Sequence, residues 1–166
     1  MAGLTYAEVG ATRAGALPVG YHHLRHRVRL PAGCFTDAAE AVLTWRLHRA
    51  AGVRMRTDAP RAVPGVVVTP GLGVGPVRLW APCVVVWVED GPDRAGFGYG
   101  TLPGHPARGE EAFLVHRDDA GRVWFEVVAF SVADRLSMRL AGPLGRRAQH
   151  AYAWWLGRTL RRLCVR

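Results

Sequence analysis

The hydrophobic residues near the start of the chain recur first at strand spacing and then at helix spacing. Residues 21–30 alternate between two faces, which is typical of an extended strand, and Pro31 ends this pattern. Apolar residues then recur at helical spacing after Thr36 and Asp37, either of which is a suitable cap for a helix that ends at Gly52. The first third of the chain therefore predicts one strand followed by one helix.

The middle of the chain is rich in short β-branched runs that glycine and proline turns separate. This pattern predicts strands over residues 66–68, 77–80, 83–89, 97–102, 111–117 and 122–131. The residues between the last two strands are typical of a hairpin, and we expect Arg117 to pair with Arg122. That register would put Glu111 on one sheet face with large apolar side chains, namely Phe113, Val115, Trp124, Val128 and Phe130.

The last segment has a helical pattern from Leu140 to Val165, with Pro143 in the first turn or just before it. Its predicted apolar stripe contains Leu140, Leu144, Ala148, Tyr152, Trp155, Leu156, Leu160 and Leu163. A curved antiparallel sheet wrapped around this helix would bury the stripe. We therefore expect an α+β fold in a single domain over residues 1–166, with room for a cavity between the sheet and the C-terminal helix.

Composition narrows the class of protein. The 166 residues, of which 49% are hydrophobic and 21% charged, suit one folded domain and exclude a disordered or fibrous chain. No apolar run approaches the roughly 20 residues that a membrane-spanning helix needs, and the N-terminus lacks the layout of a signal peptide. We expect a cytoplasmic protein that is a monomer or a homodimer.

The sequence gives little support to a metal or a cofactor. Cys34, Cys83 and Cys164 are odd in number and far apart, which indicates reduced thiols. His22 and His26 would share one face of the first strand, but no carboxylate lies near them in sequence. We expect neither a metal nor a cofactor.

The net charge of +9 comes entirely from arginine, because all 22 basic residues are Arg and the chain has no Lys, Ile or Asn. The joint absence of these three residues, which have A/T-rich codons, indicates a G+C-rich genome. The arginines are spread along the chain without a basic tail. This distribution disfavours nucleic acid as the partner.

The most distinctive sequence motif is Gly-Phe-Gly-Tyr-Gly-Thr-Leu-Pro-Gly-His-Pro at residues 96–106, followed by Gly-Glu-Glu-Ala-Phe at residues 109–113. Together with residues 4–12, it closely resembles the DUF1990 (UPF0548) family of uncharacterised bacterial and plant proteins, and the resemblance covers nearly the whole chain. One departure is Val132-Ala133, where the family usually has Arg-Pro. The family resembles the helix-grip superfamily of START-type lipid-transfer domains, polyketide aromatase/cyclases and birch-allergen-like proteins. This resemblance implies a curved sheet around the C-terminal helix and a hydrophobic cavity, but no reaction.

The same motif contains several polar and ionisable side chains close together in sequence. A phenol, a hydroxyl, an imidazole and two carboxylates fall within thirteen residues: Tyr99, Thr101, His105, Glu110 and Glu111. One interpretation is a pocket in which His105 acts as a general base and Tyr99 orients a substrate oxygen. The other is structural, with glycines and prolines forming a demanding turn and Glu111 pairing with an arginine. The candidate partners of Glu111 are His105, Tyr99 and an arginine of the last helix such as Arg146 or Arg147. Because adjacent strand residues face opposite ways, we expect only Glu111 to be internal.

These observations favour binding of a small hydrophobic molecule, lipid-like or polyketide-like, between the sheet and the last helix. The candidate ligand-binding residues are Tyr99, Thr101, His105, Glu111, Phe113, Trp124, Phe130, Tyr152 and Trp155. The alternative is an enzyme of the cyclase or hydrolase type that uses His105, Glu110 or Glu111, and Tyr99. A third hypothesis, nucleic-acid binding through surface arginine, has less support.

Overall fold

A computed structural model describes residues 3–133 and 136–165, with side chains described outside residues 136–143. One antiparallel sheet of eight strands forms the centre of the molecule, with strand order β1-β8-β7-β6-β5-β3-β2 and β4 paired to β3. The strands are β1 (His22–Arg29), β2 (Arg54–Arg56), β3 (Val67–Val74), β4 (Val77–Trp80), β5 (Cys83–Asp90), β6 (Arg94–Thr101), β7 (Ala107–Arg117) and β8 (Val123–Ala133).

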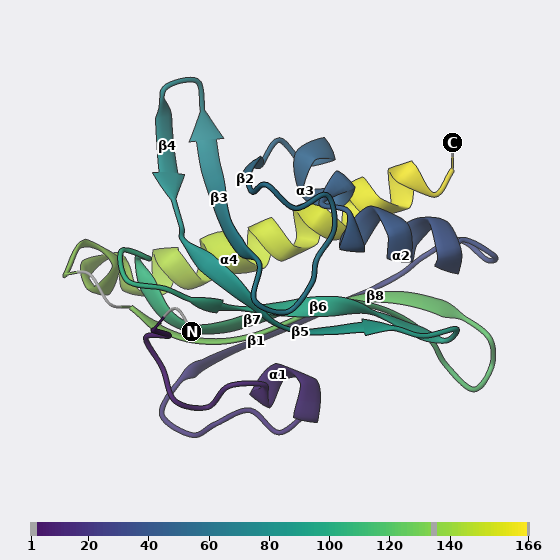
Figure 1. Cartoon of the computed structure of the whole chain (residues 1–166), viewed down its shortest axis with the longest axis horizontal. Coiled ribbons are helices and arrows are strands. Elements are labelled where there is room, and N and C mark those ends of the chain that lie inside the picture. Colours follow the sequence, from purple (N-terminus) through teal and green to yellow (C-terminus); the bar gives the residue numbers. More distant parts are fainter. Residues whose placement is uncertain (1–2, 134–135, 166) are drawn as a thin grey trace.

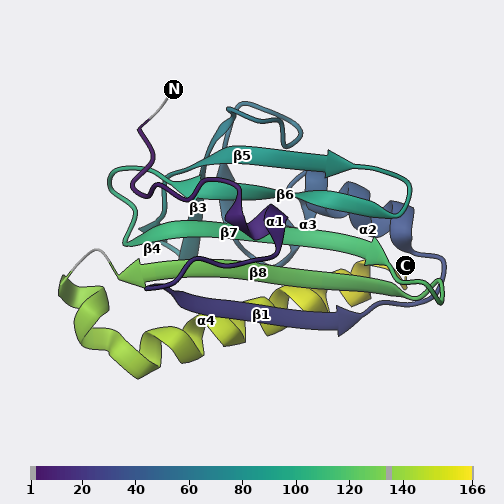
Figure 2. The same cartoon turned by 90° about the horizontal axis from the view of Figure 1, so that it is seen from below.

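The helices divide between the two faces of the sheet. The long helix α4 (Leu136–Leu163) lies on one side with α2 (Phe35–Leu43) and α3 (Arg46–Ala50), as Figure 1 shows. The short helix α1 (Ala11–Ala14) lies on the other side with the N-terminal segment (Figures 1 and 2). We call the α4 side the inner face and the α1 side the outer face. The α+β architecture and the strand-rich middle of the chain, predicted from periodicity, are confirmed.

The predicted single helix after the first strand is wrong in two respects: it begins at Phe35, before the predicted caps Thr36 and Asp37, and it is broken at Trp45. That residue has φ 64°, in the left-handed region, and separates α2 from α3. Its fully buried indole packs edge-on against Phe97 with ring centroids 4.9 Å apart, and its Nε1 donates to the carbonyl oxygen of Ala59 at 3.0 Å. Burial of a large aromatic side chain stabilises the strained backbone at this position.

The C-terminal helix begins earlier than predicted, so Pro143 lies inside it and not in its first turn. The side chains that it buries are Ala153, Leu156, Thr159 and Leu160, and Gly157 lets Val28 of β1 approach closely. Leu144 and Trp155, predicted in the apolar stripe, are instead exposed. The predicted stripe was too wide because the helix contacts the sheet along a narrow strip; Leu140 falls outside the described side chains.

The predicted hairpin register is also wrong, by one residue. Arg117 pairs with Val123 instead of Arg122, so Glu111 lies opposite Ala129. The Asp118 carboxylate accepts hydrogen bonds from the backbone N–H of Arg122 at 2.9 Å and from Nε1 of Trp124 at 2.9 Å, which closes a longer turn. Such a slip moves every side chain of the partner strand to the opposite face. Trp124 and Phe130 therefore belong to the outer face, away from Glu111.

The outer face is covered by aromatic side chains that lie on bare glycine positions of β6. A Cβ at Gly98 would collide with Nε1 of Trp87, and one at Gly100 would collide with Oη of Tyr6. The rings therefore occupy the space that side chains on β6 would fill. The close approach that Gly98 and Gly100 allow is therefore made by the protein's own side chains.

Replacing Gly100 with alanine should force Tyr6 off the sheet and lower the free energy of unfolding by about 1–3 kcal/mol, as overpacking does. Urea denaturation would measure the change. Gly3→Ala is the matched control, because a Cβ at Gly3 meets nothing within 4 Å. Equal unfolding midpoints for both variants would contradict this account.

Candidate functional site

The centre of the inner face holds a carboxylate–phenol pair. Tyr99 of β6 and Glu111 of β7 are cross-strand partners in the sheet. Oη of Tyr99 donates a hydrogen bond to Oε2 of Glu111 at 3.0 Å. Among the side chains that the structure describes, no arginine forms an ion pair with Glu111. Glu111 thus faces inward as predicted and is half-buried, and of its three candidate partners, His105, Tyr99 and an arginine, it contacts Tyr99. The register that led to this prediction was wrong.

Burial changes the acidity of this pair. Desolvation raises the pKa of Glu111 from 4.5 to about 7, and the hydrogen bond from Tyr99 opposes part of that rise. Burial, and then the nearby carboxylate, raise the pKa of Tyr99 well above 10. Near neutral pH, Glu111 can therefore hold or release a proton while Tyr99 remains a hydrogen-bond donor.

A second phenol, Tyr152 of α4, lies within electrostatic range of the pair. Burial raises its pKa well above 10, and the charge of Glu111 adds to this effect. Its hydroxyl is buried, yet it has no hydrogen-bond partner among the described residues. A buried hydroxyl without a partner is uncommon in folded proteins.

Two hollows lie next to these groups. The smaller, of about 60 Å³, is lined by Tyr99, Thr101, His105, Glu111, Ser131 and Gln149, among others. The larger, of about 420 Å³, lies between the β3–β4 hairpin and α3–α4, and its walls include Leu72, Val74, Arg78, Tyr152 and Trp155. The first has room for about two water molecules. The second is within the range of small-molecule sites, roughly 300–1,000 Å³.

Other predicted site residues have structural contacts. The Thr101 hydroxyl is 2.5 Å from that of Thr5 and accepts the N–H of Gly109 at 3.0 Å. The Nδ1 atom of His105 lies 2.9 Å from the backbone N of Ala107, within its own turn. These contacts agree with the structural interpretation of the turn, while both side chains still line the smaller hollow.

The aromatic candidates separate in the same way. Phe113 is fully buried on the inner face, with its ring 5.4 Å from that of Tyr99. Phe130 packs against Tyr6 on the outer face, and Trp124 lies under the guanidinium of Arg27. Trp155 lines the larger hollow and donates from Nε1 to the carbonyl oxygen of Ala51 at 3.0 Å.

The prediction that only Glu111 would be internal is wrong, because Glu110 is only 2% exposed, more buried than Glu111, although it faces the other way. Its carboxylate accepts hydrogen bonds from Oη of Tyr6 at 2.7 Å, the N–H of Gly10 at 2.7 Å and both the N–H and hydroxyl of Thr12. Trp87 Nε1 is 3.3 Å away. The Glu110 carboxylate therefore holds the N-terminal segment on the outer face, although the residue is also among those that line the smaller hollow.

A buried histidine was also missed. His48 of α3 is fully buried, and its ring lies edge-on to Phe113 at 4.6 Å. Burial lowers its pKa to about 3, so it is neutral at physiological pH. The helical spacing around Leu47 pointed to burial in this region but could not indicate that the imidazole belongs to the core.

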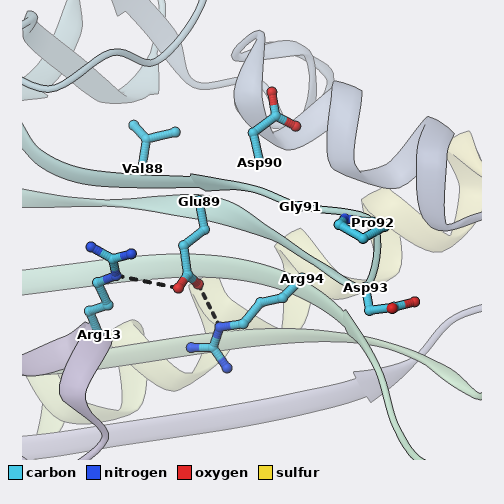
Figure 3. Close-up of a pocket in the computed structure, with 8 residues that line it drawn as sticks. All are labelled: Arg13, Val88, Glu89, Asp90, Gly91, Pro92, Asp93 and Arg94. Atoms are coloured by element: carbon cyan, nitrogen blue, oxygen red, sulfur yellow. Dashed lines mark hydrogen bonds and ion pairs between the residues drawn. The ribbon is translucent and has the colours of Figure 1, made fainter.

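A third hollow, of about 500 Å³, lies at the turn between β5 and β6 (Figure 3). Glu89 is held there between Arg13 of α1 at 3.3 Å and Arg94 at 2.6 Å. The neighbouring Asp90 and Asp93 pair with arginines as well, Arg61 and Arg117. These charges neutralise one another, so the cluster joins α1 to the sheet and we assign it no ligand.

The described residues contain no group of three or more side chains that could hold a metal ion. None of the helices in the described part of the chain is both long and apolar enough to cross a bilayer.

Comparison with known proteins agrees with this architecture. The family model described as "Domain of unknown function (DUF1990)" matches residues 5–159. A UPF0548 protein of Deinococcus radiodurans is 37% identical over 170 residues, covering 93% of this chain and 86% of that protein.

Solved structures of low sequence identity have the same fold. Ara h 8.0201 superposes with a TM-score of 0.61 at 8% identity, covering 88% of this chain and 99% of that one. The ginseng major latex-like protein 151 of Panax ginseng has a TM-score of 0.57 at 14% identity, covering 85% and 95%. The family resemblance and the helix-grip fold that the sequence predicted are both confirmed.

Replacing Glu110 with glutamine should lower the free energy of unfolding by about 2–4 kcal/mol, because an amide cannot accept the same set of buried N–H and O–H donors. The N-terminal segment should also become more sensitive to trypsin at Arg13. Glu126→Gln is the control, since Glu126 forms only partly exposed ion pairs on the same face. An unchanged unfolding midpoint in Glu110→Gln would contradict the assigned role.

Replacing Glu111 with glutamine should have an effect that depends on pH. The folded carboxyl has a pKa of about 7 against 4.5 unfolded, so the wild type loses stability as the pH rises through this window. Above pH 7 the variant should be more stable by as much as about 3 kcal/mol, and below pH 4.5 the two should be similar. Urea denaturation at about pH 4.5 and about pH 8.5 would test this. The exposed Asp119, changed to asparagine, is the control; a difference independent of pH for Glu111→Gln would argue against a buried ionisable carboxyl.

Proposed function

The chain belongs to the DUF1990 family, and from its inner face we propose that it binds a small hydrophobic molecule that carries an oxygen acceptor. The ligand would occupy the 420 Å³ hollow between the β3–β4 hairpin and α3–α4. The helix-grip neighbours support binding in general, because this fold places a curved sheet against a helix.

The observation that carries the proposal is a pair of buried donor atoms without hydrogen-bond partners among the described residues, on two residues that line this hollow. The Tyr152 hydroxyl and Nε of Arg78 are both buried, and neither has a hydrogen-bond partner among the described residues. Both residues line the 420 Å³ hollow. Unpaired buried donors cost free energy, which a ligand carbonyl, hydroxyl or ether oxygen would recover.

The remaining walls favour an apolar body for this ligand. Val53, Leu72, Val74 and Trp155 surround the hollow with aliphatic and aromatic surface. Few convergent polar groups in an apolar wall are typical of sites for small molecules. A lipid-like or polyketide-like molecule, with one oxygenated end toward Tyr152, has the required distribution of polarity.

A second candidate function is supported by the acidity of Glu111. A carboxyl with a pKa of about 7 is suited to general acid–base catalysis near neutral pH, and His105 and Ser131 line the same small hollow. Glu110 is excluded from this role because it lies on the outer face. Hydrolysis of p-nitrophenyl butyrate that Glu111→Gln abolishes while the fold persists would support an enzyme; equal rates in both proteins would reject it.

Binding is tested with naphthol and naphthalene, which differ by one oxygen, using intrinsic tryptophan fluorescence. Tyr152→Phe should weaken naphthol binding by about tenfold, leave naphthalene binding unchanged and preserve stability, because the lost hydroxyl has no partner among the described residues. Leu72→Trp should block both compounds by filling the hollow, whereas Val63→Trp, at an exposed loop position, should block neither. Equal binding of both compounds by Leu72→Trp and the wild type would overturn the proposal.

A further inference from the structure

The β3–β4 hairpin extends away from the rest of the sheet (Figure 1), and its tip is apolar. At this tip Val74 is 86% exposed and Val77 is 80% exposed. Strand β4 pairs only with β3 in the described sheet, so the tip has no further strand to support it. Two extended valines at the end of a projecting hairpin are unfavourable in water unless another surface covers them.

Helix α4 carries an exposed stripe on the side of this hairpin. The stripe runs at heptad spacing through Leu144, Ala148, Ala151, Trp155, Arg158 and Arg162, all of which are exposed. Trp155 and Val74 line the same hollow, so the hairpin and the stripe adjoin one another. The first half of the stripe is apolar and the second half is cationic.

The elements that adjoin the hairpin and the stripe are rich in arginine, while α2 on the same side of the sheet carries Asp37 and Glu40. Helix α4 contains six arginines and no acidic residue. Residues 41–88, which include α3 and the hairpin, contain six arginines and one acidic residue, Asp58. The acidic side chains described above, such as Glu89, Glu110 and Asp118, belong instead to β5, β7 and the β7–β8 turn.

We propose that the hairpin face, defined as Val74, Val77, Trp155, Arg158 and Arg162, binds the surface of a bilayer that contains anionic phospholipids. Aliphatic side chains at a projecting tip can enter the acyl region, and tryptophan favours the interface between acyl chains and headgroups. Arginines beside them meet anionic headgroups. A nucleic acid would use the arginines and the indole but would leave the valines exposed.

Charge complementarity favours a bilayer that contains anionic phospholipids over a neutral bilayer. Each basic residue near an anionic leaflet strengthens binding by about fivefold, and the effect falls as salt screens it. The valines add a contribution that salt does not screen. Binding should therefore require anionic lipid and also depend on the hairpin tip.

The test is flotation of the full chain with vesicles of phosphatidylcholine alone, or with about one third phosphatidylglycerol, near physiological salt. We expect binding to the anionic vesicles and at least tenfold weaker binding to neutral ones. The double variant Val74→Ser/Val77→Ser should reduce anionic binding by about tenfold or more. Arg158→Gln/Arg162→Gln should reduce it by about 30-fold and flatten its salt dependence.

Matched controls lie on other surfaces. Val9→Ser/Val19→Ser removes two exposed valines of the N-terminal segment, and Arg25→Gln/Arg29→Gln removes two exposed charges of β1. Both controls should bind vesicles more tightly than the hairpin-face variants. Failure to bind anionic vesicles, or equal losses in controls and hairpin-face variants, would overturn the proposal. So would a stable dimer, seen by light scattering without vesicle binding, that Val74→Ser/Val77→Ser dissociates.

Discussion

Because adjacent strand residues point to opposite faces of the sheet, the carboxylate of Glu110 lies on the outer face and that of Glu111 on the inner face. The groups that pack on each face are arranged around these two carboxylates. On the outer face, Glu110 gathers donors from Tyr6, Gly10 and Thr12, which holds the N-terminal segment against the sheet. On the inner face, Glu111 has only the Tyr99 hydroxyl as a hydrogen-bond donor among the described residues. The Glu110 carboxylate accepts hydrogen bonds from several donors of the fold, whereas the Glu111 carboxylate can still accept a hydrogen bond from a further donor.

This difference explains why the two carboxylates serve different purposes. A carboxylate that accepts several buried hydrogen bonds stabilises the fold only while all its donors remain in place. A carboxyl with one donor in a desolvated setting has a raised pKa and can exchange a proton near neutrality. The outer site therefore belongs to the structure of the fold, and the inner site belongs to the proposed ligand chemistry.

The inner site and the hairpin face meet at one place. The 420 Å³ hollow is bounded by Tyr152 on one side and by Val74 of the projecting hairpin on the other. The unpaired donors and one of the exposed valines of the hairpin tip therefore belong to residues that line the same hollow. The two proposals rest on separate observations, unpaired buried donors in one case and exposed valines with arginine in the other.

The sequence by itself determined the element order, the α+β architecture and the family, because hydrophobic periodicity and a long glycine-rich motif are local properties. It also indicated Tyr99 as one of three candidate partners of Glu111, with His105 and an arginine as the others. Only the tertiary structure decided the β7–β8 register, where the Asp118 hydrogen bonds lengthen the turn by one residue and move Trp124 to the outer face. Likewise, the burial of Glu110 depends on Tyr6, Gly10 and Thr12, which are about 100 residues distant in sequence and meet it only when the N-terminal segment folds over the sheet. Periodicity describes which face a side chain shares with its neighbours along one element, but contacts between distant elements determine what that face meets.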